Sequence, residues 1–383
     1  MVKLILLGLL AGALFSSTFI LNEFMSSAGG HWFWSASLRY LFAWLLLSAI
    51  IAMQHGFGRL KELTAIFLTH WRFWCITGSI GFGIFYTSIC YAADHVAGWV
   101  VAATFMFTVV ASLLVLMAFG QRFDKKFIVY ALLLFLGVVL VNVSEGLHAS
   151  SIATSASTPM AEMLLFGALP ALIAAFSYPI GNQMVWQVSY NTRIKNAELR
   201  HIRENTTDQN LDNNQILATE APPLTTIDIA NHPSTETITA ASHSTPIPSK
   251  SMLQNLISRI PAIETDLLQN AFNKVWLMTL GSLPFWLILG IIVRPAAPSS
   301  FQLFNILLVA ILAGVAATSI FLYAREKAET SSEVAGVDAT QASEVIFALI
   351  GGILLLDNVF PSAMGLIGIA LIIVGLVLFA KDG

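Results

Sequence analysis

The sequence predicts an all-α integral membrane protein with ten transmembrane helices, arranged as two inverted five-helix repeats. Three observations predict this fold class. The composition is 56% hydrophobic with only 11% charged residues, ten long apolar runs follow one another, and the first five runs resemble the last five. A soluble domain carries about 25% charged residues, so this chain has too few to cover the surface of a soluble enzyme.

The charged residues are concentrated in one segment. Residues 191–273 hold 15 of the 41 charged side chains, and the other 300 residues hold 26. This segment is rich in Thr, Asn, Ser and Pro and has few aromatic residues, so it cannot bury enough apolar surface to fold alone. We expect a polar, largely disordered cytoplasmic insert at 191–273, with a short amphipathic segment at 251–271 that rests on the membrane surface.

The apolar runs predict the membrane spans, because a helix needs about 20 apolar residues to cross a hydrocarbon core of about 30 Å. These runs are continuously apolar rather than alternating, which favours helices over strands. The expected spans are 4–22, 33–53, 74–93, 97–119, 127–143, 162–187, 275–293, 303–323, 336–356 and 362–380. The first repeat therefore occupies 1–150, the sixth span lies in 151–190, and the last four spans complete the second repeat in 274–383.

The positions of Lys and Arg predict the orientation, because cytoplasmic loops are enriched in both. With both termini cytoplasmic, 17 of these residues lie on the inner side and only Arg294 lies in an outer loop. Leaving out the seven from Arg193 to Lys274, because long loops obey this rule poorly, still gives ten against one. We therefore expect a multi-pass protein of a bacterial plasma (inner) membrane, with both termini and the insert cytoplasmic.

The two halves of the chain share polar residues in matching spans. When the spans are superimposed in order, the matching residues are Ser17 and Ser177, Asn22 and Asn182, Gly83 and Gly314, and Thr87-Ser88-Ile89 and Thr318-Ser319-Ile320. Five spans are an odd number, so the two repeats must have opposite topology. Inverted repeats occur in many secondary transporters, which hold their substrate near the midplane where the repeats meet.

Several short motifs occur along these spans in a fixed order. They are Ser37-Leu38-Arg39-Tyr40, Phe119-Gly120-Gln121-Arg122, Gly137, Glu344-Val345-Ile346-Phe347-Ala348 and Leu354-Leu355-Leu356-Asp357. In this order the sequence resembles the drug/metabolite transporter superfamily, in its EamA-like and multidrug-resistance-efflux branches. The family's usual Glu is replaced by Gln121. The resemblance implies ten helices in two inverted repeats, alternating access, and transport of small molecules, often outward.

Three ionisable residues lie well inside the expected spans, where a charge costs roughly 2.5–3.5 kcal/mol and therefore faces a cavity or a partner. We expect Glu344 to be a protonatable or cation-binding carboxylate, or else a structural partner of Arg39. Arg39 either holds an anionic substrate or pairs with a carboxylate. Asp338 either caps its helix or contributes to binding. Glu23 lies at the end of its span, which predicts an interfacial position.

Uncharged polar and aromatic residues complete the candidate substrate route. We expect cavity lining by Asn22 and Asn182, with helix–helix hydrogen bonding as the alternative. The same two interpretations apply to Ser17, Ser177 and Tyr178. An aromatic or cationic substrate could stack on Tyr86, Tyr91 or Tyr323, with ordinary packing near the membrane interface as the alternative.

Signatures of other functions are absent from the sequence. It has no GxxxxGK[ST] to bind a nucleotide and no HExxH, and its two cysteines lack metal-binding spacing. A net charge of −3 provides no basis for binding nucleic acid. We therefore expect no enzyme, cofactor or metal site.

The sequence thus predicts a secondary active transporter in the lipid bilayer. It would export small, drug-like or metabolite molecules by alternating access, with protons as the candidate coupling ion. The alternatives are a facilitative exchanger of an anionic or zwitterionic metabolite and a non-transporting membrane subunit or sensor.

Overall fold

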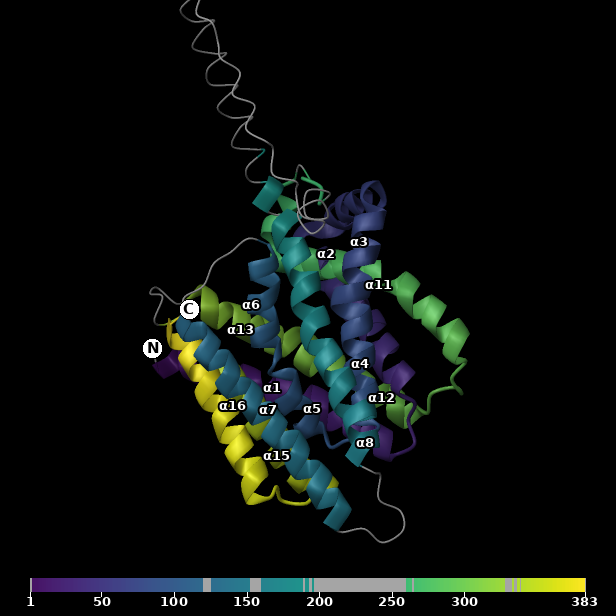
Figure 1. Cartoon of the computed structure of the whole chain (residues 1–383). Helices are drawn as coiled ribbons and strands as arrows, with labels where there is room; N and C mark the ends of the chain where they lie inside the picture. Colours follow the sequence, from purple (N-terminus) through teal and green to yellow (C-terminus); the bar gives the residue numbers. More distant parts are fainter. Residues whose placement is uncertain are drawn as a thin grey trace, which may run out of the picture. The chain divides into compact units, whose positions relative to one another are not determined.

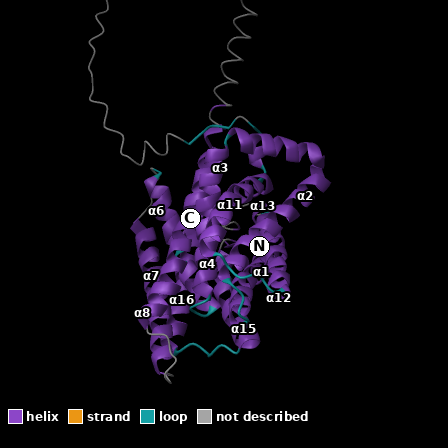
Figure 2. Ribbon diagram, turned by 90° about the vertical axis from the view of Figure 1, so that its right-hand side faces the viewer, coloured by secondary structure: helices purple, strands orange, loops and turns teal. Residues whose placement is uncertain are grey.

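The computed structural model describes residues 2–119, 125–151, 160–188, 190–192, 195, 260–263, 265–327, 333, 336–337 and 339–382. Within these residues all regular structure is helical and no strand occurs, as Figure 2 shows. The chain divides into two compact units, Met1–Trp186 with Asp266–Gly383, and Gln187–Thr265.

Nine helices in the described part of the chain are long and apolar enough to cross a membrane (Figure 1). Five come from the first half: Val2–Ser27 (α1), Trp32–Thr69 (α2), Trp71–Ala93, Gly98–Ala118 and Lys125–Leu147, the last of which lies in α7 (Lys125–Ser151). The span Trp71–Ala93 consists of α3 (Trp71–Gly78), η1 (Ser79–Ile84) and α4 (Phe85–Ala93). The span Gly98–Ala118 contains α5 (Gly98–Phe105) and α6 (Thr108–Ala118). Four follow: Met160–Thr192, Ala271–Val293 (α11), Ser300–Phe321 and Ala363–Asp382 (α16). The span Met160–Thr192 starts with α8 (Met160–Glu162) and η2 (Met163–Ala168). The span Ser300–Phe321 consists of α12 (Ser300–Val309), η4 (Ala310–Ala317) and the start of α13 (Thr318–Glu326).

The ninth expected span forms a shorter apolar helix, Thr340–Leu356, which consists of η5 (Thr340–Ala342) and α15 (Ser343–Leu356). The second span is instead longer than expected, because α2 continues to Thr69 through a kink at Gly56. Gly56 has φ 78°, a left-handed conformation that glycine adopts without strain.

Three spans in the described residues contain π-helical turns, one of them at Met163–Ala168 in the sixth span, and the other two lie at matching places of the two halves. Ser79–Ile84 interrupts the third span, and Ala310–Ala317 interrupts the eighth. The repeat-related glycines Gly83 and Gly314 lie inside these two segments. A π turn adds a residue to the turn and rotates the helix that follows, and such turns are frequent at functional sites. The first of them directly precedes Tyr86.

The helices α7 and α16 pack against each other in antiparallel directions (Figure 1). At one end, Tyr130 donates a hydrogen bond to Asp382. Further along, a Cβ at Gly137 would lie 2.7 Å from the Gly368 carbonyl oxygen, and a Cβ at Gly368 would lie 2.8 Å from that of Gly137. This crossing therefore requires glycine on both helices.

Glycines also let spans of the two halves approach closely elsewhere. A Cβ at Gly81 would lie 3.0 Å from the Gly181 Cα, so η1 and the helix Met160–Thr192 meet backbone to backbone. A methyl group at Gly281 of α11 would overlap the carbonyl group of Trp74 in α3. Small residues of this kind are typical of tightly packed helices in membranes.

Glu23, near the end of α1, connects three parts of the bundle. Its Oε2 accepts a hydrogen bond from the Gly98 backbone N–H at 2.7 Å, and its Oε1 accepts one from Asn358 Nδ2 at 2.8 Å. Ala97, the N-cap residue of α5, has no side chain that can cap the helix, so Glu23 supplies the cap from another helix.

We expect Glu23→Ala to lower the free energy of unfolding by about 1.5–3 kcal/mol, because it removes hydrogen bonds to a carboxylate. Thermal unfolding in detergent measures this loss. The control is Glu62→Ala, whose side chain is 60% exposed and pairs with Arg59 on the surface of α2. That variant should change stability by less than about 0.5 kcal/mol. Equal losses in both variants would contradict the capping role.

The unit Gln187–Thr265 has its own hydrogen bonds. Thr192 Oγ1 donates to the Ile263 carbonyl at 2.8 Å and accepts from the Ile263 N–H at 3.0 Å. Residues 260–263 are not helical, whereas 251–259 of the expected amphipathic segment lie outside the described residues.

Candidate functional site

Arg39 of α2 lies among polar and aromatic side chains of other helices. Its Nη1 donates a hydrogen bond to Thr18 Oγ1 of α1 at 3.1 Å. Its guanidinium carbon lies 4.1 Å from the centroid of the Tyr86 ring, a cation–π contact. Among the residues that the structure describes, no carboxylate forms an ion pair with Arg39. The positive charge is therefore held by a hydroxyl group and an aromatic ring, without a counter-ion among the residues that the structure describes.

A hydrogen-bond acceptor lies beside this guanidinium. Tyr86 is completely buried, and its hydroxyl oxygen accepts from Asn22 Nδ2 at 3.2 Å. The carbonyl oxygen of Asn22 is also buried but has no hydrogen-bond partner. A buried polar atom without a partner costs about 1–3 kcal/mol, and seven other side-chain atoms in the described residues share this condition.

Aromatic side chains form one wall next to Arg39. The ring of Tyr40 stacks on Phe82 with centroids 4.9 Å apart and on Trp286 at 5.9 Å, and it meets Tyr86 edge-on at 5.6 Å. These rings come from α2, η1, α11 and α4. Phe82 and Trp286 could not be predicted as neighbours of Arg39, because nothing in their local sequence connects them to it.

Tyr178 and Asn182 belong to the helix Met160–Thr192. The Tyr178 hydroxyl group and the Asn182 side chain are hydrogen-bonded, and the ring lies 5.0 Å from that of Phe85. Tyr178 also interacts electrostatically with both Arg39 and Glu344.

Glu344 is in the first turn of α15 and is half-buried. A Cβ at Gly12 of α1 would overlap the hydroxyl group of Ser343, so the start of α15 lies directly against α1. Positive partial charge at a helix N-terminus stabilises a carboxylate. Within the described residues, the Glu344 carboxylate has neither an ion pair nor a hydrogen bond.

Arg39 and Glu344 lie at different depths along α1. Ser343 packs at Gly12, whereas Arg39 binds Thr18, which is six residues later and roughly 9 Å further along the helix. Arg39 and Glu344 do not form an ion pair with each other.

The remaining predicted residues lie elsewhere. Ser17 donates to the carbonyl of Leu14 at 2.6 Å in its own helix, and Ser177 is buried. Tyr91 packs at the end of α4, with ring centroids 5.6 Å from Trp32 and 4.7 Å from His95.

Tyr323 and Asp338 are not among the residues placed around Arg39. The Tyr323 side chain is half-exposed, and the Lys327 ammonium lies 5.8 Å from its ring. Asp338 lies outside the described residues. The structure thus brings together Arg39, Asn22 and Tyr86, and places Tyr178, with its partner Asn182, within electrostatic range of both Arg39 and Glu344.

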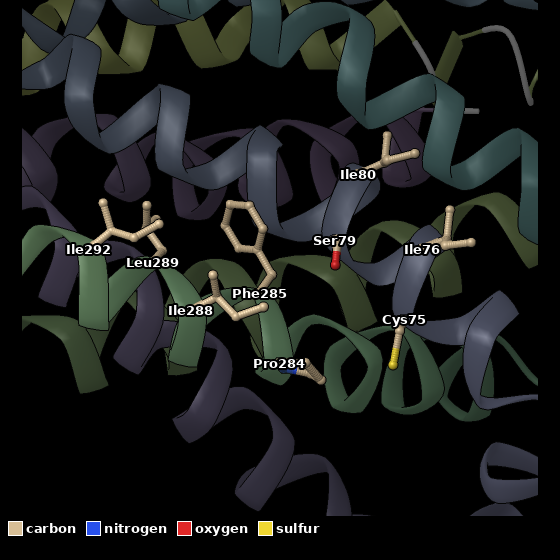
Figure 3. Close-up of a pocket in the computed structure, with 9 residues that line it drawn as sticks. All are labelled: Cys75, Ile76, Ser79, Ile80, Pro284, Phe285, Ile288, Leu289 and Ile292. Atoms are coloured by element: carbon tan, nitrogen blue, oxygen red, sulfur yellow. The ribbon is translucent and has the colours of Figure 1, made fainter.

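An apolar groove of about 470 Å³ lies between α3, η1 and α11 (Figure 3). Ile76 and Ile80 line one side, and Phe285, Ile288 and Leu289 line the other. None of the candidate residues borders this groove. Among the residues that are described, no three His, Cys, Asp or Glu side chains gather as metal ligands.

The sequence is similar to known proteins, one over nearly its whole length and one over about half of it. A protein from Bacillus subtilis (strain 168), "Uncharacterized protein YjlA", is 29% identical over 98% of this chain and 94% of its own. A 42.1 kDa protein encoded in the intracellular alkaline protease 3′ region of Shouchella clausii is 36% identical over 47% of this chain and 46% of its own. A solved structure titled "Crystal structure of protein" shares the fold with a TM-score of 0.51 and 13% identity, over 100% of this chain and 99% of that one.

A family model described as "EmrE: Putative multidrug resistance efflux transporter" matches residues 2–382. With nine membrane-length helices in the described residues, this match shows a multi-pass integral membrane protein. The chain therefore belongs to the EmrE family of multidrug resistance efflux transporters.

Proposed function

We propose that the protein is a proton-coupled secondary transporter that exports small molecules by alternating access, with Glu344 as the residue that carries the coupling proton. The observation that carries this proposal is the Glu344 carboxylate at the start of α15, which has no ion pair within the described residues and follows Ser343, the residue that packs against α1. A carboxylate without a counter-ion in such a place is costly, so it is expected to hold either a proton or a cation.

Transport is coupled to protons because Glu344 holds either a proton or a cation, but not both at once. When the site is open to one side of the membrane, a cationic substrate displaces the proton from Glu344. When it is open to the other side, a proton displaces the substrate. An empty, ionised carboxylate is unfavourable in the closed intermediate between the two open states. The protein therefore changes from one open state to the other only when Glu344 holds a proton or a substrate cation. The proton gradient then drives export.

Two features support a pair of inverted five-helix repeats as the moving parts. The π turns at Ser79–Ile84 and Ala310–Ala317 match when Gly83 is placed on Gly314. The fifth and last spans run antiparallel, as opposite topologies require. The distribution of Lys and Arg supports cytoplasmic termini and a cytoplasmic 191–273 loop in a bacterial inner membrane.

Transport by the purified protein in proteoliposomes tests the proposal. The probe is benzyltrimethylammonium, an aromatic cation whose fixed charge rules out passage as a neutral amine. An acidic interior is expected to drive its accumulation, and dissipating the pH gradient with a protonophore should stop it. If no member of a panel of organic cations and zwitterions moves with the gradient, coupled export is wrong.

A facilitative exchanger is the second candidate, favoured because Arg39 has no counter-ion among the residues that the structure describes. Such a protein would exchange an anionic or zwitterionic metabolite for another molecule of the same kind. Counterflow that ignores an imposed pH gradient would identify it.

Deleting residues 204–250, which lie outside the described residues, is expected to leave gradient-driven flux within about twofold of the intact protein. The polar composition of this segment suits a linker. Flux is measured at equal amounts of reconstituted protein. Loss of flux with normal folding would instead favour a regulatory or docking role for the loop.

A further inference from the structure

We propose that the cytoplasmic end of α3 binds an anionic phospholipid, with its phosphate group on Arg72 and one acyl chain in the apolar groove between α3 and α11. Lipid binding here is independent of the proposed transport activity, and only the choice of leaflet depends on the proposed orientation. Three features of this region point to a lipid: a groove open to the bilayer, a basic residue next to it, and a neighbouring segment at the level of the headgroups.

The groove offers an acyl chain an apolar surface that is open to the outside of the bundle. Ile76 of α3 is 54% exposed and Ile288 of α11 is 61% exposed, although both line the groove. Of the described residues that line it, only Ser79 and Cys75 have a hydroxyl or thiol group (Figure 3). Both helices belong to spans of membrane length, so this face lies against the acyl chains of the bilayer.

A close helix crossing fixes the walls of the groove. A Cβ at Gly78 would overlap the carbonyl oxygen of Met278, so the backbones of α3 and α11 touch beside the lining residues. The groove therefore does not depend on flexible side chains alone. A preformed groove binds a chain with less loss of conformational entropy in the protein.

Arg72 adjoins the groove at the start of α3. Residues three and four apart are neighbours on a helix, so Arg72 lies next to Cys75 and Ile76. Arg72 is exposed, and its guanidinium carbon lies 5.4 Å from the centroid of the Trp71 ring. Within the described residues, no carboxylate forms an ion pair with it. A phosphate group can therefore bind the guanidinium through two oxygens without displacing a partner.

The course of α2 indicates that the start of α3 lies at the membrane surface. The bend at Gly56 turns the rest of α2 across the end of the bundle, where it leads into α3 (Figure 2). This part of α2 has exposed apolar side chains, Phe57 at 75% and Leu68 at 63%, together with the basic residues Arg59 and Lys61. Apolar and basic residues on one helix are typical of segments that lie in the headgroup region.

The charges at this end favour an anionic headgroup over a zwitterionic one. Arg59 pairs with Glu62, whereas Lys61 and Arg72 have no ion pair in the described part of the chain. Trp71 is 51% exposed, and tryptophan is enriched at the level of the headgroups. A basic residue near the membrane surface raises the affinity for anionic lipid roughly fivefold.

Binding of defined lipids to the purified full-length protein tests the inference. Native mass spectrometry counts the bound molecules of dioleoyl phosphatidylglycerol or dioleoyl phosphatidylcholine, which have the same chains but differ in headgroup charge. We expect the wild-type protein to bind the first phosphatidylglycerol about fivefold more tightly than the first phosphatidylcholine. Arg72→Gln should lower this ratio to about one, and Arg72→Lys should retain most of it, because lysine keeps the charge.

Arg294→Gln is the matched control. Arg294 is also exposed, but it lies at the C-terminal end of α11, where its side chain donates to the Ile291 carbonyl at 3.3 Å. This variant should keep the full ratio. If the ratio falls to one in Arg294→Gln but not in Arg72→Gln, the lipid binds at the opposite end and the assignment to Arg72 is wrong.

A phosphatidylglycerol with a photoreactive diazirine in one acyl chain tests the groove itself. It is expected to label peptides containing residues 75–80 or 284–292, and unlabelled phosphatidylglycerol should suppress this labelling. Labelling only at other peptides would rule out the groove. A dimer that keeps the label out of these peptides would mean that a second copy covers it. Equal affinity of the wild-type protein for both lipids would overturn the proposal without the need for any variant.

Discussion

Glu344→Gln is expected to reduce pH-gradient-driven uptake of benzyltrimethylammonium by about 100-fold, while the purified protein remains folded. Glutamine has nearly the same shape as a protonated glutamate, so the start of α15 can pack against α1 as before. It cannot ionise, however, and therefore offers the cation no charge and releases no proton. The loss corresponds to one charged interaction.

The control for this variant is Glu162→Gln, because Glu162 is an exposed carboxylate at the start of the sixth span. Its uptake should match that of the wild-type protein. Thermal unfolding in detergent checks that both variants are folded. Uptake by Glu344→Gln at the wild-type rate, with the same response to the gradient, would rule out Glu344 as the coupling residue.

Gly281→Ala is expected to cause a large loss of stability, roughly 1–3 kcal/mol or more, because its methyl group would overlap the carbonyl of Trp74. The obstructing atom belongs to the backbone of α3, so the overlap is relieved only if α3 and α11 move apart. The loss should appear as a lower midpoint of thermal unfolding in detergent and a lower yield of monodisperse protein.

Gly314→Ala makes the same chemical change where nothing lies within 4 Å of the new methyl group. Because alanine favours helical conformation over glycine, this variant should be neutral or more stable by up to about 1 kcal/mol. If both alanine variants have the same stability as the wild-type protein, the close crossing of α3 and α11 is not required for the fold.

Much of the helical fold could be predicted from the sequence, because long apolar runs in a membrane leave few alternatives to helices. The limits of individual helices were harder to predict. Beyond residue 53, α2 mixes polar and apolar residues, so hydropathy gives no signal for its continuation to Thr69. The π turns also had no hydropathy signal, because an extra residue in one turn leaves the composition unchanged.

The candidate site could be predicted only in part. Arg39 and Glu344 stood out because charges are rare in apolar spans. Their surroundings depend on how distant helices cross, at contacts such as that between Gly81 and Gly181. Glu23 shows the same limit: its position near the end of a span predicted an interfacial residue, and nothing in the sequence indicated that it would also cap α5.

Proton release on substrate binding tests the central claim most directly. Purified wild-type protein in weakly buffered detergent solution, with a pH-indicating dye, is titrated with benzyltrimethylammonium between pH 5 and 9. The cation carries no proton of its own, so any proton released comes from the protein. We predict release of up to about one proton per bound cation over part of this range, and none from Glu344→Gln. Saturable binding without proton release at any pH, or equal release from Glu344→Gln, would contradict the account.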